Sequence, residues 1–309
     1  MGMIWKEPVT GPKAWRGAEL ARNPAWNITL SAADLAELDR ALATAKATGL
    51  PLEQVTRAHF PLDGMAGRLD AVLDEIYDGR GFVVLRGLPV ERYRDEDVGL
   101  IFWGMGRYLG APLYQNPKGD LLGHVFHDTT RKYGDPDVRG YISNVYLPYH
   151  TDGCDLVGLL CLRRAPVGGL SSLVSSVTVY NEILAHHPEY LEMLYDGFYY
   201  IRREEVYTGT GVSERPVPVF GAKDGVVSCR YLRRQIDAGA ARRGVPLTEM
   251  ERAALDYVDE LTSRPDIRLD MDFEPGDIQL ATTTRSCTRA PSSSMGRSRT
   301  RSATCSGCG

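Results

Sequence analysis

The chain has 309 residues, of which 43% are hydrophobic and 25% are charged, with a formal net charge of -4. This composition is typical of a globular protein with a substantial core. The small acidic charge gives no reason to expect nucleic acid or an acidic membrane as a partner, and no apolar run approaches the roughly 20 residues that span a bilayer. Nothing in the composition indicates a homo-oligomer. Cys154, Cys161 and Cys229 stand in apolar segments, which favours free thiols in a reducing cytoplasm.

The first third of the chain predicts mainly helices. Ser31 and Asp34 have the spacing of a capping box, and the apolar stripe behind them predicts a helix over 31–48. A second stripe predicts a helix over 69–76. The stretch "GFVVLRGLP" then predicts a short strand bounded by chain breakers, and residues 95–109 predict another helix.

From about Gly140, short β-rich stretches alternate with glycine and proline. We expect a helix over 179–195, a hairpin that turns at Asp224-Gly225, and a helix over 248–263 with Thr248 as its N-cap. The stretch "FEPGDIQL" predicts a further strand after a Pro-Gly turn. This pattern predicts a mainly β, α+β protein in which helices pack on an antiparallel double sheet. We expect a single domain over 1–281, with a helical part over about 1–79 and a core over about 80–281.

The tetrapeptide "YHTD" carries the chemistry. His150 and Asp152 are two residues apart, so on a strand both side chains leave the same face. An imidazole and a carboxylate side by side can occupy two positions on a divalent metal ion, and one distant His would complete the 2-His-1-carboxylate triad of non-haem iron oxygenases. Taken alone, the spacing also fits a histidine beside a surface aspartate. The Gly-Gly turn that follows, with Ser171 two residues beyond it, favours the metal site, because it lets backbone approach closely and offers a hydroxyl to a carboxylate.

The stretch "NVYLPYHTDGCDLVGLLCLRRAPVGGLSSLVSSVTVYNEIL", with "GFVVLRGLP" before it and "FEPGDIQL" after it, resembles the taurine-dioxygenase-like (TauD/TfdA) family. The resemblance covers roughly residues 80 to 281. It implies a double-stranded β-helix (jelly roll) and a dioxygenase that uses Fe(II), 2-oxoglutarate and O₂ to hydroxylate or desaturate a small molecule, with release of succinate and CO₂. It also implies that His150 and Asp152 are metal ligands and that Ser171 helps to hold 2-oxoglutarate.

The family's second metal histidine and its 2-oxoglutarate arginine are missing, since no histidine follows His187. The residues from 282 to 309 are rich in Ser, Thr and Arg. Read one nucleotide out of register, they permit the family-like ending "NNHAVLHARTEFVDGPEPDAQRHLLRLW". The missing histidine then falls where Thr288 stands and the missing arginine where Ala303 stands. We interpret the chain as frameshifted at about Ala281, and we expect a disordered tail and impaired catalysis. A genuine basic tail is the alternative.

Two further functional questions stay open at this stage. A non-catalytic relative, either a pseudoenzyme or a small-molecule-binding module, would share the fold. A zinc ion bound through Cys287, Cys305 and Cys308 is a third hypothesis. The candidate substrate contacts are Asn144, Tyr146, Tyr149 and Arg230. Arg230, with Arg233 and Arg234, could bind an anionic group of the substrate, and a solvated basic edge is the competing interpretation.

Overall fold

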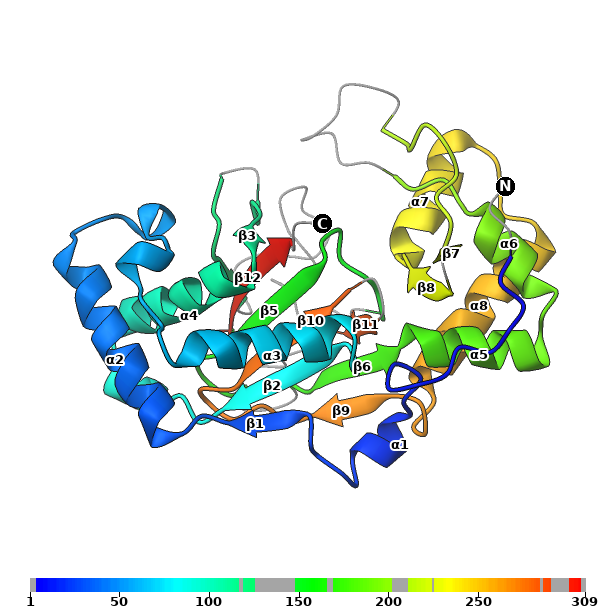
Figure 1. The fold of residues 1–309 in the computed structure, drawn as a ribbon. Coiled ribbons are helices and arrows are strands. Elements are labelled where there is room, and N and C mark those ends of the chain that lie inside the picture. Colours follow the sequence, from blue (N-terminus) through cyan, green and yellow to red (C-terminus); the bar gives the residue numbers. More distant parts are fainter. Residues whose placement is uncertain are drawn as a thin grey trace.

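Two β-sheets pack face to face, and helices cover them on the outside (Figure 1). The computed structural model describes residues 4–116, 119–125, 148–165, 169–201, 211–223 and 225–283, together with the backbone of residues 286–289 and 300–306. The predicted double sheet with surrounding helices is therefore confirmed.

The larger sheet contains the strand predicted from "GFVVLRGLP" as its second strand from one edge. The strands of this sheet are, in spatial order, β1 (Asn27–Thr29), β2 (Phe82–Arg86), β10 (Ile278–Thr282), β5 (Leu156–Cys161), β12 (Thr300–Ser306) and β3 (Ala111–Pro112). A further strand, β4 (Gly123–Val125), also pairs with β12. Strand β10 pairs antiparallel with β2 on one side and with β5 on the other, so it is hydrogen-bonded along both edges. The smaller sheet has the order β11 (Ser286–Arg289), β6 (Ser171–Ser175), β9 (Leu269–Met271).

Strand β2 is apolar without alternation because both of its faces are buried. Val83 and Leu85 pack in the cluster under the N-terminal helices. Phe82 and Val84 point the other way, into a cluster between the two sheets that also holds Leu173 of β6. Successive strand residues face opposite sides, so a strand covered on both faces reads as a continuous hydrophobic run.

The N-terminal helices follow the sequence pattern closely. They are α1 (Gly17–Leu20), α2 (Ala32–Ala47), α3 (Met65–Tyr77) and α4 (Asp95–Leu109), with short 3₁₀ turns at Leu52–Gln54, Arg57–His59 and Val90–Arg92. The predicted capping box of α2 is confirmed: Ser31 accepts from the backbone N–H of Asp34, and the Asp34 carboxylate accepts from the backbone N–H of Ser31.

The C-terminal helices are α5 (Ser176–His186), α6 (Tyr190–Asp196), α7 (Arg233–Arg243) and α8 (Glu249–Ser263). The single helix expected over 179–195 was wrong, because the chain breaks into α5 and α6 around Pro188. Proline lacks the N–H that a helix needs and disfavours helical backbone in the residue before it. Thr248 caps α8 as predicted. The predicted hairpin is confirmed as β7 (Phe220–Lys223) and β8 (Val226–Cys229).

Two segments of the tail are strands, and the disorder expected for the tail as a whole stays a prediction. Strand β11 pairs antiparallel with β6, and β12 pairs antiparallel with β5, which places these two segments in different sheets. Backbone N–H and C=O groups at a sheet edge favour pairing with whatever extended chain lies beside them. The proposed division at residue 281 stays a prediction.

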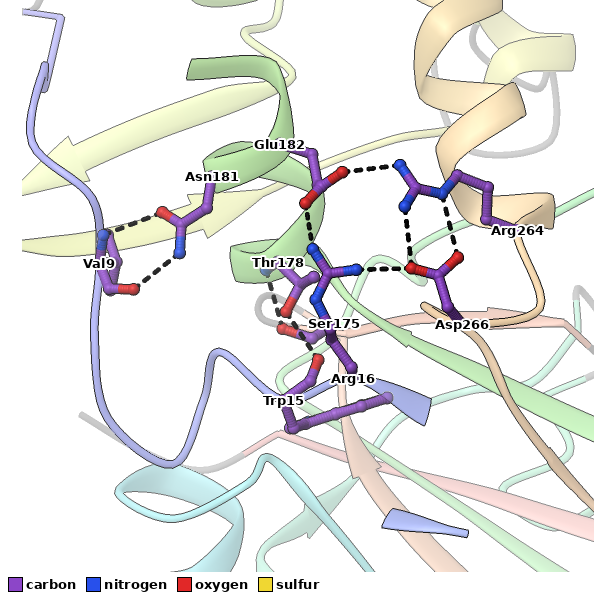
Figure 2. Close-up of polar contacts among 9 residues, drawn as sticks. All are labelled: Val9, Trp15, Arg16, Ser175, Thr178, Asn181, Glu182, Arg264 and Asp266. Atoms are coloured by element: carbon purple, nitrogen blue, oxygen red, sulfur yellow. Dashed lines mark hydrogen bonds and ion pairs between the residues drawn. The ribbon is translucent and has the colours of Figure 1, made fainter. Parts of the chain in front are cut away.

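The N-terminal segment is fixed along α5 by side chains of that helix (Figure 2). The backbone N–H of Val9 donates to the Asn181 side chain at 2.9 Å, and the same amide donates back to the Val9 carbonyl at 2.7 Å. Thr178 donates to the Trp15 carbonyl at 2.6 Å. The segment is thereby held to the helix that follows β6.

Beyond Trp15, four charged side chains form what we call the arginine–carboxylate cluster: Arg16, Glu182, Arg264 and Asp266 (Figure 2). Each arginine contacts both carboxylates, and each carboxylate contacts both arginines. The cluster connects the N-terminal segment, α5 and the chain that leaves α8. Among the described residues, no helix is both long and apolar enough to cross a membrane.

Candidate active site

The segment that carries His150 and Asp152 is positioned by the residue between them. The backbone N–H of Thr151 donates to the Tyr231 carbonyl at 2.8 Å, and the Tyr231 N–H donates to the Thr151 hydroxyl at 2.9 Å. Thr151 is buried, whereas His150 and Asp152 are partly exposed at 24% and 41% of their side-chain surface. The alternation expected of an extended segment therefore places both predicted ligands on the open face.

Tyr231 is itself fixed in the core. Its hydroxyl donates to the Asp259 carboxylate of α8 at 2.6 Å. Burial, followed by the nearby Asp259 charge, raises the pKa of Tyr231 well above its usual range. Tyr231 therefore stays a neutral donor, and the hydrogen bonds between its backbone and Thr151 start from a residue whose side chain is fixed in the core.

The His150 imidazole is held by the backbone on one side and faces Asp152 on the other. Its Nδ1 lies 2.9 Å from the Pro148 carbonyl oxygen. A carbonyl only accepts hydrogen bonds, so Nδ1 carries the proton and Nε2 presents a lone pair. Nε2 lies 4.0 Å from Oδ1 of Asp152, within the span of two metal–ligand bonds of about 2.1 Å each. A backbone carbonyl that fixes the tautomer of a ligating histidine is a common feature of metal sites.

The chain that leaves β10 passes next to Asp152. The Thr283 hydroxyl contacts the carbonyl oxygens of Asp152, at 3.2 Å, and Cys154. The Thr283 N–H donates to the Asp155 carbonyl at 3.3 Å. Sequence reasoning did not identify Thr283, although its place directly after "GDIQLAT" is a usable signal. Thr283 therefore lies against the backbone of Asp152.

Ser171 lies between the sheets, at the start of β6, and is buried. Its hydroxyl donates to Oε1 of Gln279 at 3.1 Å, and the Gln279 amide nitrogen lies 3.7 Å from the Met271 sulfur. Gln279 belongs to β10 of the opposite sheet. This polar bridge was missed by sequence reasoning, although a glutamine inside the apolar run of "DIQLA" pointed to a buried polar partner.

The start of β10 is held by a buried ion pair. Arg86 donates two hydrogen bonds to Asp277, at 2.9 and 2.6 Å, and the Asp277 side chain is fully buried. The Asp277 hydrogen bond, the largest effect, raises the pKa of Arg86. Asp277 also accepts from the Glu274 N–H at 2.9 Å. The "PGD" turn is therefore structural, and it positions the strand that leads to Thr283.

The candidate substrate residues fall into three groups. Asn144 and Tyr146 lie outside the described residues. Tyr149 is buried, and its hydroxyl hydrogen-bonds to the Ser172 hydroxyl. Arg230 is exposed and its guanidinium lies over the Tyr200 ring, 5.8 Å from the ring centre. Substrate contact stays a prediction for each of them.

A third metal ligand is not found among the described residues. No group of three His, Cys, Asp or Glu side chains there is arranged to hold a metal ion. In β11, residue 288 lies opposite Leu173 of β6, and in β12, residue 303 lies opposite Gly158 of β5. The residues present thus fit two positions of the expected iron site and leave it incomplete. The cysteine side chains of the zinc hypothesis lie outside the described residues.

Comparison with known proteins defines the class. Residues 30–287 match the family described as taurine catabolism dioxygenase TauD, TfdA family. The chain belongs to this family and is, by family, a dioxygenase. The jelly-roll fold expected from the resemblance is confirmed.

Two relatives and several solved structures show how far the similarity extends. FR-33289 synthase from Streptomyces rubellomurinus is 34% identical over 90% of this chain and 82% of its own length. The taurine hydroxylase-like protein SAT17 from Stachybotrys chartarum is 30% identical over 86% and 70%. An asparagine oxygenase in complex with Fe(II), 3-hydroxyasparagine and succinate has a TM-score of 0.71 at 16% identity, with 90% of this chain and 93% of the other covered. The non-haem iron oxygenase OrfP, in complex with iron and alpha-ketoglutaric acid, has a TM-score of 0.66 at 17% identity, with 91% and 93% covered.

Proposed function

We propose that this protein oxidises a small molecule with Fe(II), 2-oxoglutarate and O₂, by hydroxylation or desaturation. The observation that carries the proposal is the arrangement of His150 and Asp152, with Nε2 of the imidazole directed toward the carboxylate. Iron, when bound, supplies the activation of O₂ that no protein side chain provides. The cytoplasmic location is part of the same proposal.

The roles of the residues follow from their positions. His150 and Asp152 would hold the metal ion from the open face of their segment. Ser171 would offer its hydroxyl to a carboxylate of 2-oxoglutarate, because a hydroxyl can donate and accept. Gln279 would keep this hydroxyl in place, since the two side chains are hydrogen-bonded across the sheets.

The proposal includes the frameshift near Ala281. Two observations support it: Thr283 lies against the backbone of Asp152, and residue 288 lies in β11, next to the strand that carries Ser171. A histidine at Thr288 and an arginine at Ala303 would complete the family's ligand set. The family match ends at residue 287, before both positions.

As written, the chain would be a poor catalyst. Two protein ligands bind iron more weakly than three, and a 2-oxoglutarate carboxylate buried without a cation loses the charge-assisted hydrogen bonds of an arginine. We therefore expect little succinate from this chain even when its fold is intact.

The test begins with the coding DNA from Phe273 past the stop codon, sequenced on both strands. We then expect the frame-corrected chain to form succinate only when both Fe(II) and 2-oxoglutarate are present. The matched control is the same corrected chain with threonine kept at position 288, which should lose this activity. An intact reading frame in the DNA would overturn the frameshift.

A non-catalytic relative remains the second candidate, because the described residues alone do not complete an iron site. Such a protein would bind a small molecule without consuming 2-oxoglutarate. The corrected chain decides between the two: a folded protein that forms no succinate with any tested substrate, or without one, would favour the binding module.

A further inference from the structure

We propose that Tyr149 is a positioning residue, which fixes the orientation of the His150 imidazole from the buried side of its segment. This inference rests on the proposed function, because it takes His150 as a metal ligand. It gives Tyr149 a role other than the substrate contact considered from the sequence. It also adds the Ser172 hydroxyl to the groups on which the metal pair depends.

The Tyr149 side chain is anchored on the side of its segment that faces the core. It is 2% exposed and packs in an apolar cluster that also holds Val174 of β6 and Tyr180 of α5. Its hydroxyl hydrogen-bonds to the Ser172 hydroxyl. His150, the next residue, keeps 24% of its side chain exposed. Because successive residues of an extended segment face opposite sides, holding Tyr149 in the core turns His150 toward the open face.

The hydrogen bonds behind Tyr149 run in one direction and end at a carboxylate. The Ser172 hydroxyl donates to Oδ1 of Asp270 at 2.6 Å. A hydroxyl has a single proton to donate, so the Tyr149 hydroxyl is the donor in its contact with Ser172. Ser172 and Asp270 are paired residues of β6 and β9. Tyr149 is therefore attached to the hydrogen-bonded framework of the smaller sheet.

Strand β6 presents its two hydroxyls to opposite sides. Ser171 is hydrogen-bonded across to the larger sheet, and Leu173 packs in the cluster between the sheets. On the other face, Ser172 reaches Tyr149, and Val174 packs in the same cluster as Tyr149. The strand that is expected to hold 2-oxoglutarate through Ser171 therefore also holds the segment of the metal pair through Ser172.

The property of His150 that depends on Tyr149 is its tautomer. Nδ1 of His150 lies 2.9 Å from the Pro148 carbonyl oxygen, and these two residues flank Tyr149. The contact spans the backbone of Tyr149, so it depends on the conformation of that residue. An imidazole without such a contact can carry its proton on either nitrogen. A proton on Nε2, the nitrogen that faces Asp152, removes the lone pair that a metal ion needs.

The test reads the His150 tautomer in the metal-free, full-length chain by long-range ¹H–¹⁵N NMR of histidine-labelled protein. The spectra are recorded at about pH 8.5, where unperturbed imidazoles are neutral, and the His150 signals are assigned by their loss in His150→Gln. We expect the unchanged chain to hold the proton on Nδ1. Tyr149→Phe removes only the hydroxyl and should lower the ratio of the Nδ1-protonated to the Nε2-protonated form by about fivefold or more, the effect of one typical hydrogen bond.

Ser172→Ala removes the same hydrogen bond from the other partner, and we expect the same change of tautomer. In the double variant, the change should be no larger than in either single variant, because both substitutions act through one contact. Thr151 stays attached to the backbone of Tyr231 in each variant, so the segment should remain folded. If Tyr149→Phe does not fold, Ser172→Ala decides the question.

Tyr180→Phe is the matched control. Tyr180 is buried in the same apolar cluster, but its hydroxyl donates to the Trp5 carbonyl of the N-terminal segment. This variant should lose stability and leave the His150 tautomer unchanged. The inference is overturned if the unchanged chain carries the proton on Nε2, if His150 keeps a single Nδ1-protonated form in Tyr149→Phe and Ser172→Ala, or if Tyr180→Phe shifts the tautomer equally. Failure of the oxygenase proposal would show in succinate formation and not in these metal-free spectra.

Discussion

Charged side chains are paired differently in the arginine–carboxylate cluster and on the open face that carries His150 and Asp152. In the cluster, Arg16 and Arg264 each contact the two carboxylates of Glu182 and Asp266, so every charge is compensated twice. On the open face, His150 and Asp152 stand 4.0 Å apart with exposed polar atoms. Compensated charges hold the N-terminal segment to α5 and to the chain that leaves α8, whereas His150 and Asp152 lie partly exposed on a face that a ligand can reach.

The same contrast separates groups that look alike in the sequence. Asp277 and Asp152 both follow a glycine or precede one within a turn, yet Asp277 is buried against Arg86 and Asp152 is exposed beside His150. Burying a charge is costly unless it is paired. An aspartate inside the fold is therefore structural, and an aspartate at the open face can bind a ligand.

The largest effect should come from Asp277→Asn. This change leaves the Arg86 fork without its partner and removes the acceptor for the Glu274 N–H. Breaking a fully buried ion pair costs about 3–5 kcal/mol. Because 37% of the Arg86 side chain is exposed, urea unfolding should show a loss that approaches this range without reaching its upper end. Asp272→Asn is the control, because Asp272 pairs with Arg164 at the surface and should cost less than about 1 kcal/mol. Equal losses of stability in the two variants would contradict the distinction between the buried Asp277 and the exposed aspartates.

Asp152→Ala should weaken iron binding and leave the stability of the fold almost unchanged, the reverse of the effect expected for Asp277→Asn. We expect the affinity for Fe(II), measured anaerobically by calorimetry, to fall by at least about tenfold, since even the partners of metal ligands contribute about 10–100-fold. The free energy of unfolding should change by no more than about 0.5 kcal/mol, as for other exposed residues. Asp155→Ala, in the same loop, should leave iron binding unchanged. A large stability loss in Asp152→Ala would assign it a structural role.

Glu182→Gln tests the cluster itself. Removal of this charge weakens the contacts with both arginines and should cost about 1–3 kcal/mol, the range for hydrogen bonds to charged groups. Hydrogen exchange of residues 4–18 should become faster, because the N-terminal segment loses one of its attachments. Glu189→Gln, which removes an exposed contact with His187, should produce neither change.

The smallest effect concerns acid stability. The Arg264 hydrogen bond, the largest effect, lowers the pKa of Asp266. A carboxyl group with a lowered pKa in the folded state stabilises the fold above its unfolded pKa of about 3.9, and this contribution is lost as the pH falls through the folded value. Asp266→Asn should therefore reduce stability slightly at pH 7, by less than about 1 kcal/mol. It should also flatten the decline below about pH 4, and an unchanged decline would contradict this account.

Much of the fold could be predicted because its signals are local. The helix over 95–109, the capping boxes of α2 and α8, and the hairpin before Gly225 all depend on residues a few positions apart. The prediction of one helix over 179–195 was wrong because the apolar pattern continues on both sides of Pro188. The proline interrupts the helix all the same, since it lacks the N–H that a helix needs.

The placement of His150 and Asp152 on one face could also be predicted from the sequence, since two residues two apart on one extended segment share a face whatever surrounds them. The absence of any histidine after His187 was equally plain, and with it the incomplete ligand set.

Tertiary structure alone decided which of the other charges and hydroxyls are available. The pairing of Thr151 with Tyr231, the bridge from Ser171 to Gln279, and the three carboxylates around Arg233 each join residues far apart in the chain. Such contacts depend on how sheets and helices pack, and no local pattern encodes them. The sequence therefore determined that His150 and Asp152 share a face, and the packing decided that Arg233 is held by carboxylates of two helices.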